Sequence, residues 1–347
     1  MNFNLIREAF FQNERVSAYR QITGGNINKS YLVTLENGNE FLLQKINKVV
    51  FTNPECVMKN AVLISDFLKE KGKNALEYVK AKDGKSFFTD DEKEYWRVMK
   101  YFNDTISYSF ADDDLKAYKT GEAYGRFYGD LKDFDIKLLN YTIRDFHNKE
   151  SRYQSLLDSF NTTDRKETDL FDCLRKMTEE VLKDRNLVNS IPKRVTHNDT
   201  KIDNLLFDKK TGECVAVVDM DTVMPGYVID DFGDAARSVA STASENERDE
   251  SKISFDLNKF AGFTEGFAKE TKHMLTATET GALYYGVASV TAELACRFLS
   301  DYFNHDVYFG INYPEHNLVR AANQIALLKD VLLKQGEIKG IINKKFG

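Results

Sequence analysis

Hydrophobic positions along this chain change their spacing near residue 105. Before that point, short apolar runs typical of strands alternate with turns, and beyond it most apolar positions recur at helical spacing. The clearest helical patterns in the second part cover residues 115–131, 168–187, 257–269, 283–303 and 317–333. A short β interruption is expected between Pro192 and Asp221. The pattern therefore predicts an α+β chain with a small antiparallel β-sheet first and a larger, mostly helical part second.

The first hundred residues contain a hairpin signal. Asn37-Gly38 separates the apolar runs 33–35 and 40–44, and both residue types tolerate the positive φ that a tight hairpin turn needs. Two further strand-like runs cover 76–81 and 95–102. We expect these segments to form one small sheet.

One helix is predicted in the same region. Asn53 is a candidate N-cap, Pro54 suits the first helical position, and Gly72 follows the last turn. The apolar positions between these signals lie on one face of a helix; they are Val57, Ala61, Ile64 and Leu68.

No linker rich in Ser, Gly or Pro separates the two parts. We therefore expect two lobes joined by a short hinge at residues 99–104. The first lobe is expected over residues 1–103 and the second over 104–347.

Composition restricts the classes of function. The chain has 347 residues, of which 42% are hydrophobic and 29% charged, so intrinsic disorder is excluded. The formal net charge is −6, and no basic stripe is present, so nucleic acid is not an expected partner. The four cysteines are widely spaced and favour neither a disulfide framework nor a zinc site. With no signal peptide and no apolar run of ~20 residues, we expect a cytoplasmic protein without a membrane span.

The most informative motif is His197-x-Asp199-x-x-x-x-Asn204. This is the spacing of the catalytic loop in phosphoryl-transfer kinases. Transfer of a γ-phosphoryl group needs a group that accepts the proton of the attacking hydroxyl, and it needs neutralisation of the phosphate charge. Asp199 is the candidate catalytic base, and His197 is expected to order the loop.

An apolar run at 214–218 is predicted to form a strand that ends at Asp219. Asn204 and Asp219 would then hold Mg²⁺ against the phosphates of ATP, because Mg²⁺ prefers hard oxygen ligands. Asp221 lies two residues on and would face the same side if the strand continued. The triplet Asp231-Phe232-Gly233 imitates a kinase metal motif, but no apolar strand precedes it. We expect Asp231 or Asp234 to cap a helix or to fix the catalytic loop.

The segment 23–30 contains a glycine turn between strand-like segments. Together with the catalytic loop, it is a candidate cover for the nucleotide phosphates, with Gly24, Gly25 and Asn28 as nucleotide-binding residues. Lys45 or its neighbour Gln44 would face the phosphates, because strand alternation allows only one of them to do so. We favour Lys45.

At these residues the chain resembles the aminoglycoside phosphotransferase/choline kinase superfamily, and within it the kinases that act on N-acetylhexosamines. The resemblance runs nearly end to end and is carried by residues 25–28, 43–47, 196–201, 219–226, 297–302, 306–309 and 313–320. It implies a two-lobed, protein-kinase-like fold and the use of ATP and Mg²⁺ to phosphorylate the anomeric hydroxyl of N-acetylglucosamine and N-acetylgalactosamine. It also implies sugar-binding roles for Asp199, Asp221, Arg297 and Tyr308.

Alternatives remain open at this point. Another small-molecule kinase of the same superfamily would act on choline, homoserine, methylthioribose or an aminoglycoside. A pseudokinase would keep the fold without turnover, although Asp199, Asn204 and Asp219 are all present. We expect a monomer, and the preferred hexosamine epimer and nucleotide are not determined by the sequence.

Overall fold

The computed structural model describes residues 3–12, 14–22 and 27–347. It divides into two compact units, each described here by itself. The first comprises Met1–Ile106, Phe134–Arg144 and Leu206–Met224, and the second comprises Ser107–Asp133, Asp145–Leu205 and Pro225–Gly347. The predicted division at residues 1–103 and 104–347, with its hinge at 99–104, stays a prediction.

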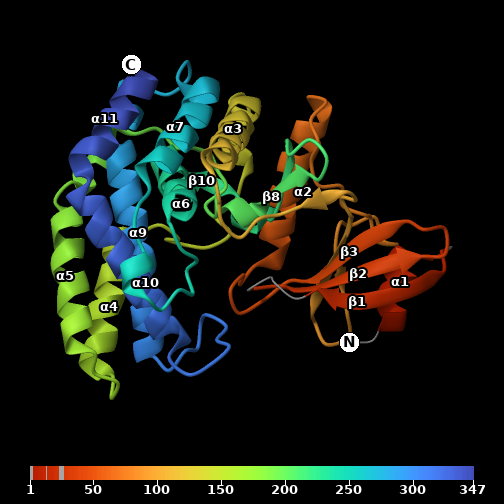
Figure 1. Cartoon of the computed structure of the whole chain (residues 1–347). Helices are drawn as coiled ribbons and strands as arrows, with labels where there is room; N and C mark the ends of the chain where they lie inside the picture. The colour runs from red at the N-terminus through yellow and green to blue at the C-terminus, as the bar shows by residue number, and fades with distance from the viewer. Residues whose placement is uncertain (1–2, 13, 23–26) are drawn as a thin grey trace. The chain divides into compact units, whose positions relative to one another are not determined.

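A five-stranded sheet forms the centre of the first unit (Figure 1). Its order is β1-β2-β3-β5-β4, and every neighbouring pair is antiparallel. The strands are β1 (Val16–Ile22), β2 (Lys29–Leu35), β3 (Glu40–Lys45), β4 (Phe88–Thr89) and β5 (Tyr95–Lys100). The predicted hairpin is confirmed, since β2 and β3 pair around a turn in which Gly38 has φ +86°. A second sheet has the order β6-β8-β9, with β6 (Thr105–Ile106), β8 (Leu205–Asp208) and β9 (Cys214–Val217).

Helix α2 (Pro54–Glu70) begins and ends as the sequence signals predict. The Asn53 side chain accepts a hydrogen bond from the backbone N–H of Cys56, and Gly72 follows the last turn with φ +71°. The four residues predicted to share one face are all buried. The prediction of this helix is confirmed.

Two features of the first unit differ from the expectation. A short helix, α1 (Phe3–Phe10), packs its buried residues against the sheet and contributes Ile6 and Phe10 to the core. Eight residues carry too little periodicity for a helix to be recognised. The strand expected over 76–81 is absent, because in this stretch the ladder is reduced to an isolated bridge between Tyr78 and Met99.

The second unit is mainly helical. Its helices are α3 (Asp114–Leu131), α4 (Lys149–Thr162), α5 (Thr168–Leu182), α6 (Val228–Ala240), α7 (Leu257–Thr271), α8 (Ala277–Gly281), α9 (Leu283–Phe303), α10 (His316–Leu333) and α11 (Gln335–Phe346). Strand β7 (Arg194–Thr196) pairs with β10 (Met224–Gly226), whose last two residues belong to this unit. The five helical patterns predicted here all correspond to helices. Among the described residues, no helix is long and apolar enough to span a bilayer.

Helix α9 is the central element of the second unit and packs against α4, α5, α6 and α10 (Figure 1). The contact with α6 is unusually close. A Cβ added to Gly286 would lie 2.0 Å from the carbonyl oxygen of Ile229, and one added to Gly233 would lie 2.3 Å from that of Gly286. Only glycine permits this approach. It holds the first turn of α6 against α9.

This contact generates a prediction about stability. Gly286→Ala is expected to lower the free energy of unfolding of the helical unit by about 1–3 kcal/mol, because the methyl group must push two backbones apart. Gly340→Ala in α11 is the matched control, since a Cβ there meets nothing within 4 Å. Urea unfolding followed by circular dichroism measures both variants. Equal stabilities would contradict the close-contact interpretation.

Candidate active site

The motif at residues 197–204 forms a loop in the second unit that folds back on itself. It follows β7 and ends in a short 3₁₀ turn, Ile202–Asn204. The Asn204 side-chain amide donates hydrogen bonds to the Asp199 carbonyl oxygen at 2.7 Å and to Asp199 Oδ2 at 2.9 Å. The five-residue spacing therefore brings these two predicted residues together.

The backbone of this loop is hydrogen-bonded to Asp231, which lies in the first turn of α6. Its carboxylate accepts hydrogen bonds from the backbone N–H of His197 at 2.6 Å and of Asn198 at 2.8 Å, and from the Tyr128 hydroxyl. Burial raises the pKa of Asp231 to about 6, although the hydrogen bond from Tyr128 and the proximity of His197 oppose the increase. The prediction that Asp231 or Asp234 fixes the catalytic loop is confirmed for Asp231.

Asp199 is stabilised as a carboxylate. Burial alone would raise its pKa, but Lys201, His197 and the Asn204 hydrogen bond together hold the pKa of Asp199 below its usual value. The Lys201 Nζ atom lies 3.4 Å from Asp199 Oδ2. A carboxylate that stays ionised at neutral pH and lies next to a hydrogen-bond donor can accept a proton from an approaching hydroxyl.

In the first unit, the carboxylates of the Asp219–Asp221 segment lie on a turn. Strand β9 ends at Val217, Asp219 has φ +59°, and residues 220–222 form a 3₁₀ turn. The condition under which Asp219 and Asp221 would share one strand face is therefore not met. The buried Asn60 side chain of α2 donates to the Val223 carbonyl oxygen at 2.8 Å and supports this turn.

Asp221 is buried in an ion pair that sequence reasoning missed. Its partner is Arg97 of β5, whose Nη1 and Nη2 both donate to the carboxylate, the second at 3.0 Å. Asn28 Nδ2 adds a hydrogen bond at 2.7 Å. Arg97 is only 2% exposed, and it also donates to Gln44 Oε1 at 2.7 and 3.0 Å. The sequence feature that could have indicated this ion pair is the single arginine within the otherwise apolar strand residues 95–99. The proposed sugar contact of Asp221 stays a prediction.

The predicted phosphate-binding residues have different surroundings. The Lys45 ammonium lies 3.2 Å from Glu94 Oε1 and forms an ion pair with it. The neutral Gln44 side chain instead accepts a hydrogen bond from Arg97. Asn28 contacts Asp221 and receives the backbone N–H of Asn47 at 3.0 Å. Gly24 and Gly25 lie outside the described residues. The nucleotide-binding roles of Gly24, Gly25, Asn28 and Lys45 stay predictions.

Arg297 and Tyr308 lie together in the second unit. The Arg297 guanidinium is 5.1, 5.6 and 5.3 Å from the ring centroids of Phe146, Tyr308 and Phe309, and its Nη2 donates to the Tyr308 hydroxyl at 3.4 Å. The backbone N–H groups of Tyr308 and Phe309 each donate to the Asp301 carboxylate at 2.8 Å. An aromatic surface with a cationic donor results, and such a surface suits a polar ring-shaped ligand.

A buried ionic cluster next to Arg297 was not predicted. Glu293 lies one helical turn before Arg297 on α9 and pairs with His147, whose other ring nitrogen is 3.2 Å from the Asn198 carbonyl oxygen. Lys149 lies 3.8 Å from Glu293 Oε2 and forms an ion pair with Asp230. No local motif joins these residues, so the sequence carried no signal for them.

The donor atoms available for a metal are hard oxygens. The Asn204 amide nitrogen donates to Asp199, so the amide oxygen is the atom of this side chain that could ligate a cation. Asp219 supplies a carboxylate from the first unit. Among the described residues, no group of three or more His, Cys, Asp or Glu side chains is placed to hold a metal ion. Asn204 and Asp219 each offer a hard oxygen of the kind that Mg²⁺ prefers, and their role as metal ligands stays a prediction.

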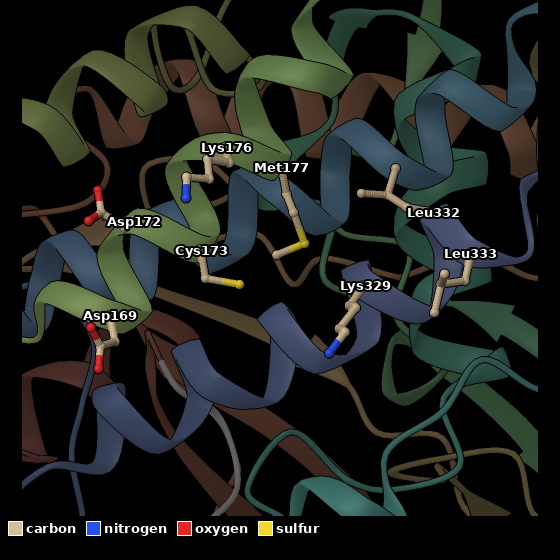
Figure 2. Close-up of a pocket in the computed structure, with 8 residues that line it drawn as sticks. All are labelled: Asp169, Asp172, Cys173, Lys176, Met177, Lys329, Leu332 and Leu333. Carbon is tan, nitrogen blue, oxygen red and sulfur yellow. The ribbon is translucent and has the colours of Figure 1, made fainter.

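A separate hollow of about 680 Å³ lies on the second unit between α5 and α10 (Figure 2). Its lining includes Cys173 and Met177 from α5 and Lys329 and Leu333 from α10. No predicted site residue lines this hollow, so it is not the candidate active site.

Comparison with known proteins identifies a family and similar folds. The profile of the "Phosphotransferase enzyme family" matches residues 18–263. Spectinomycin phosphotransferase in complex with ADP and spectinomycin has a similar fold, with a TM-score of 0.64, 10% identity and coverage of 96% of this chain and 97% of that one. Amicoumacin kinase, in complex with AMP-PNP and Ca²⁺, gives a TM-score of 0.63 at 12% identity, covering 93% and 92%. Choline kinase from Streptococcus pneumoniae gives 0.59 at 12% identity, covering 95% and 99%. These structures support the kinase-like α+β fold.

The ion pair in the first unit generates a prediction. Arg97→Met is expected to lower the free energy of unfolding by about 3–5 kcal/mol, because it leaves the Asp221 carboxylate buried without its cation. The double variant Arg97→Met/Asp221→Leu should be less destabilised than Arg97→Met, since no unpaired charge remains. Fluorescence of Trp96, the single tryptophan and the neighbour of Arg97, reports unfolding of this unit.

Lys45→Met is the matched control, because it breaks the more exposed pair with Glu94 and should cost ~1 kcal/mol or less. An Arg97→Met variant as stable as Lys45→Met would contradict a structural role for the buried pair.

Proposed function

We propose that this chain, which belongs to the phosphotransferase enzyme family, has the activity of an N-acetylhexosamine 1-kinase. It would transfer the γ-phosphoryl group of ATP to the anomeric hydroxyl of N-acetylglucosamine or N-acetylgalactosamine. The observation that carries the proposal is the folded loop in which Asn204 donates two hydrogen bonds to Asp199. Membership of the family supports phosphoryl transfer, and the finer assignment rests on the residues described below.

The reaction follows from the chemistry of the loop. The anomeric hydroxyl gives its proton to the Asp199 carboxylate while its oxygen forms a bond to the γ-phosphorus, and the bond to the ADP oxygen breaks. The low pKa of Asp199 keeps the carboxylate ready to accept that proton. Asn204 and Asp219 would hold Mg²⁺, which neutralises phosphate charge when bound. The products are ADP and a sugar 1-phosphate.

The acceptor is inferred from Arg297 and its aromatic neighbours. Tyr308 is 42% exposed, so its ring and hydroxyl are available to a ligand, and Arg297 adds a planar set of N–H donors. An acetamido carbonyl and sugar hydroxyls are acceptors that match these donors. A quaternary ammonium or a polycationic aminoglycoside would face the positive charge of Arg297, which makes choline and aminoglycosides poorer candidates.

An acceptor panel tests the proposal. Purified protein with ATP and Mg²⁺ is expected to consume ATP with N-acetylglucosamine or N-acetylgalactosamine and not with choline, homoserine, methylthioribose or kanamycin. The sugar should lose its reducing end as the 1-phosphate forms. Turnover with choline or kanamycin alone would keep phosphoryl transfer and overturn the sugar assignment, and no turnover with any acceptor would favour a pseudokinase.

The base assignment gives a separate prediction. Asp199→Asn is expected to lower kcat by about two or more orders of magnitude, because the amide cannot accept the hydroxyl proton, while ATP binding changes little. Asp203→Asn makes the same change on an exposed side chain four residues on and should keep turnover within about twofold. Steady-state kinetics measures kcat, and calorimetry measures ATP binding. A normal kcat in Asp199→Asn would exclude Asp199 as the base.

A further inference from the structure

The His147 ring lies between helix α9 and the catalytic loop. Its Nδ1 is 3.0 Å from Glu293 Oε2, and its Nε2 is 3.2 Å from the Asn198 carbonyl oxygen. A carboxylate and a carbonyl are both acceptors, so each ring nitrogen must carry a proton for both contacts to be hydrogen bonds. A neutral imidazole has only one N–H group. Both contacts can be hydrogen bonds at the same time only when the ring is an imidazolium.

Charged groups from three helices surround this ring. Glu293 and its neighbour Arg297 come from α9, Lys149 from α4 and Asp230 from α6. Burial would raise the pKa of Glu293, but His147, Lys149 and Arg297 lower it to about 2, so this partner stays ionised. Burial likewise opposes charge on the ring, but Glu293 outweighs it and raises the pKa of His147.

Glu293 depends strongly on this ring. Its side chain is 2% exposed, and its Oε1 has no hydrogen-bond partner among the residues that the structure describes. Oε2 receives the His147 N–H, while Lys149 stays 3.8 Å away. A buried carboxylate with so few donors is held by the nearby positive charge. Glu293 and His147 therefore form one unit.

The carbonyl that His147 contacts belongs to a residue with a left-handed backbone. Asn198 has φ +64°, a conformation that is uncommon for non-glycine residues but that asparagine tolerates. The Asn198 N–H donates a hydrogen bond to the Asp231 carboxylate at 2.8 Å. The Asn198 carbonyl oxygen contacts the His147 ring. Because the next peptide group is planar, the direction of this carbonyl fixes where the Asp199 backbone begins.

We propose that the His147 imidazolium, anchored by Glu293, is a positioning residue that holds the Asn198 carbonyl and thereby the catalytic base Asp199. The proposal rests on the phosphoryl-transfer function proposed above. As pH rises through the raised pKa of His147, the ring loses a proton and one of its two hydrogen bonds. Turnover is then expected to fall on the alkaline side for this reason, and the stabilising contribution of the cluster is lost in the same direction.

His147→Gln tests the role in turnover. Glutamine carries both of its N–H donors on one nitrogen and has no charge, so it cannot replace the two separate ring donors, and kcat with the active sugar is expected to fall about 10- to 100-fold while the KM for ATP changes little. The alkaline decline that belongs to His147 should also disappear from the pH profile of kcat. His273→Gln, on an exposed side chain of the same unit, should change neither quantity. A wild-type kcat, or a reduced kcat with an unchanged pH profile, would overturn the proposal.

Nitrogen-15 NMR of the ligand-free wild-type protein supplies a second readout. The His147 ring is identified by its contact with the Phe146 ring, whose centroid is 4.8 Å away. The midpoint of the ring titration is expected to lie above the ordinary value of about 6.5, with both ring nitrogens protonated below that midpoint. A midpoint at or below the ordinary value would overturn the proposal. This spectrum needs no acceptor and no variant, so it decides the state of His147 even if every acceptor fails and the proposed function falls.

Discussion

The carboxylate of Asp231 binds two successive backbone N–H groups of the loop at residues 197–204, and the arrangement of the loop depends on this interaction. Asn198 takes a left-handed conformation, which is uncommon for non-glycine residues, and it is immediately followed by Asp199. With the backbone fixed by Asp231, the loop can turn through residues 202–204 and return Asn204 to Asp199. The Tyr128 hydroxyl and burial keep Asp231 itself in one position.

Packing within the helical unit places the partners of this loop. The contact of Gly233 with Gly286 holds α6 against α9 more closely than side chains would allow. Asp231 and Asp230 lie on α6, and Glu293 and Arg297 lie on α9, so one helix pair carries the groups that support the loop and those next to the inferred acceptor site. The close packing of the two glycines therefore determines where the charged side chains of α6 and α9 lie.

Local sequence signals predicted the helix and the loop that are formed by residues close together in the chain. The contacts that were not predicted join residues far apart in the sequence. The helix over residues 54–70 and the loop with Asp199 and Asn204 depend on spacings of a few residues, which a sequence displays directly. The pairs Arg97–Asp221 and His147–Glu293 join residues 124 and 146 positions apart, so neither spacing nor periodicity could reveal them. Asp221 would have faced the same side as Asp219 only if the strand had continued, but the strand ends at Val217, and the Asp221 side chain pairs with the buried Arg97.

The most direct test of the account is a crystal structure with a non-hydrolysable ATP analogue, Mg²⁺ and N-acetylglucosamine. We expect an Asp199 carboxylate oxygen within hydrogen-bond distance of the anomeric oxygen, about 2.6–3.2 Å, with Arg297 and Tyr308 contacting the sugar. A sugar bound with another hydroxyl at Asp199, or bound away from Asp199 altogether, would contradict phosphorylation at the anomeric position by this loop.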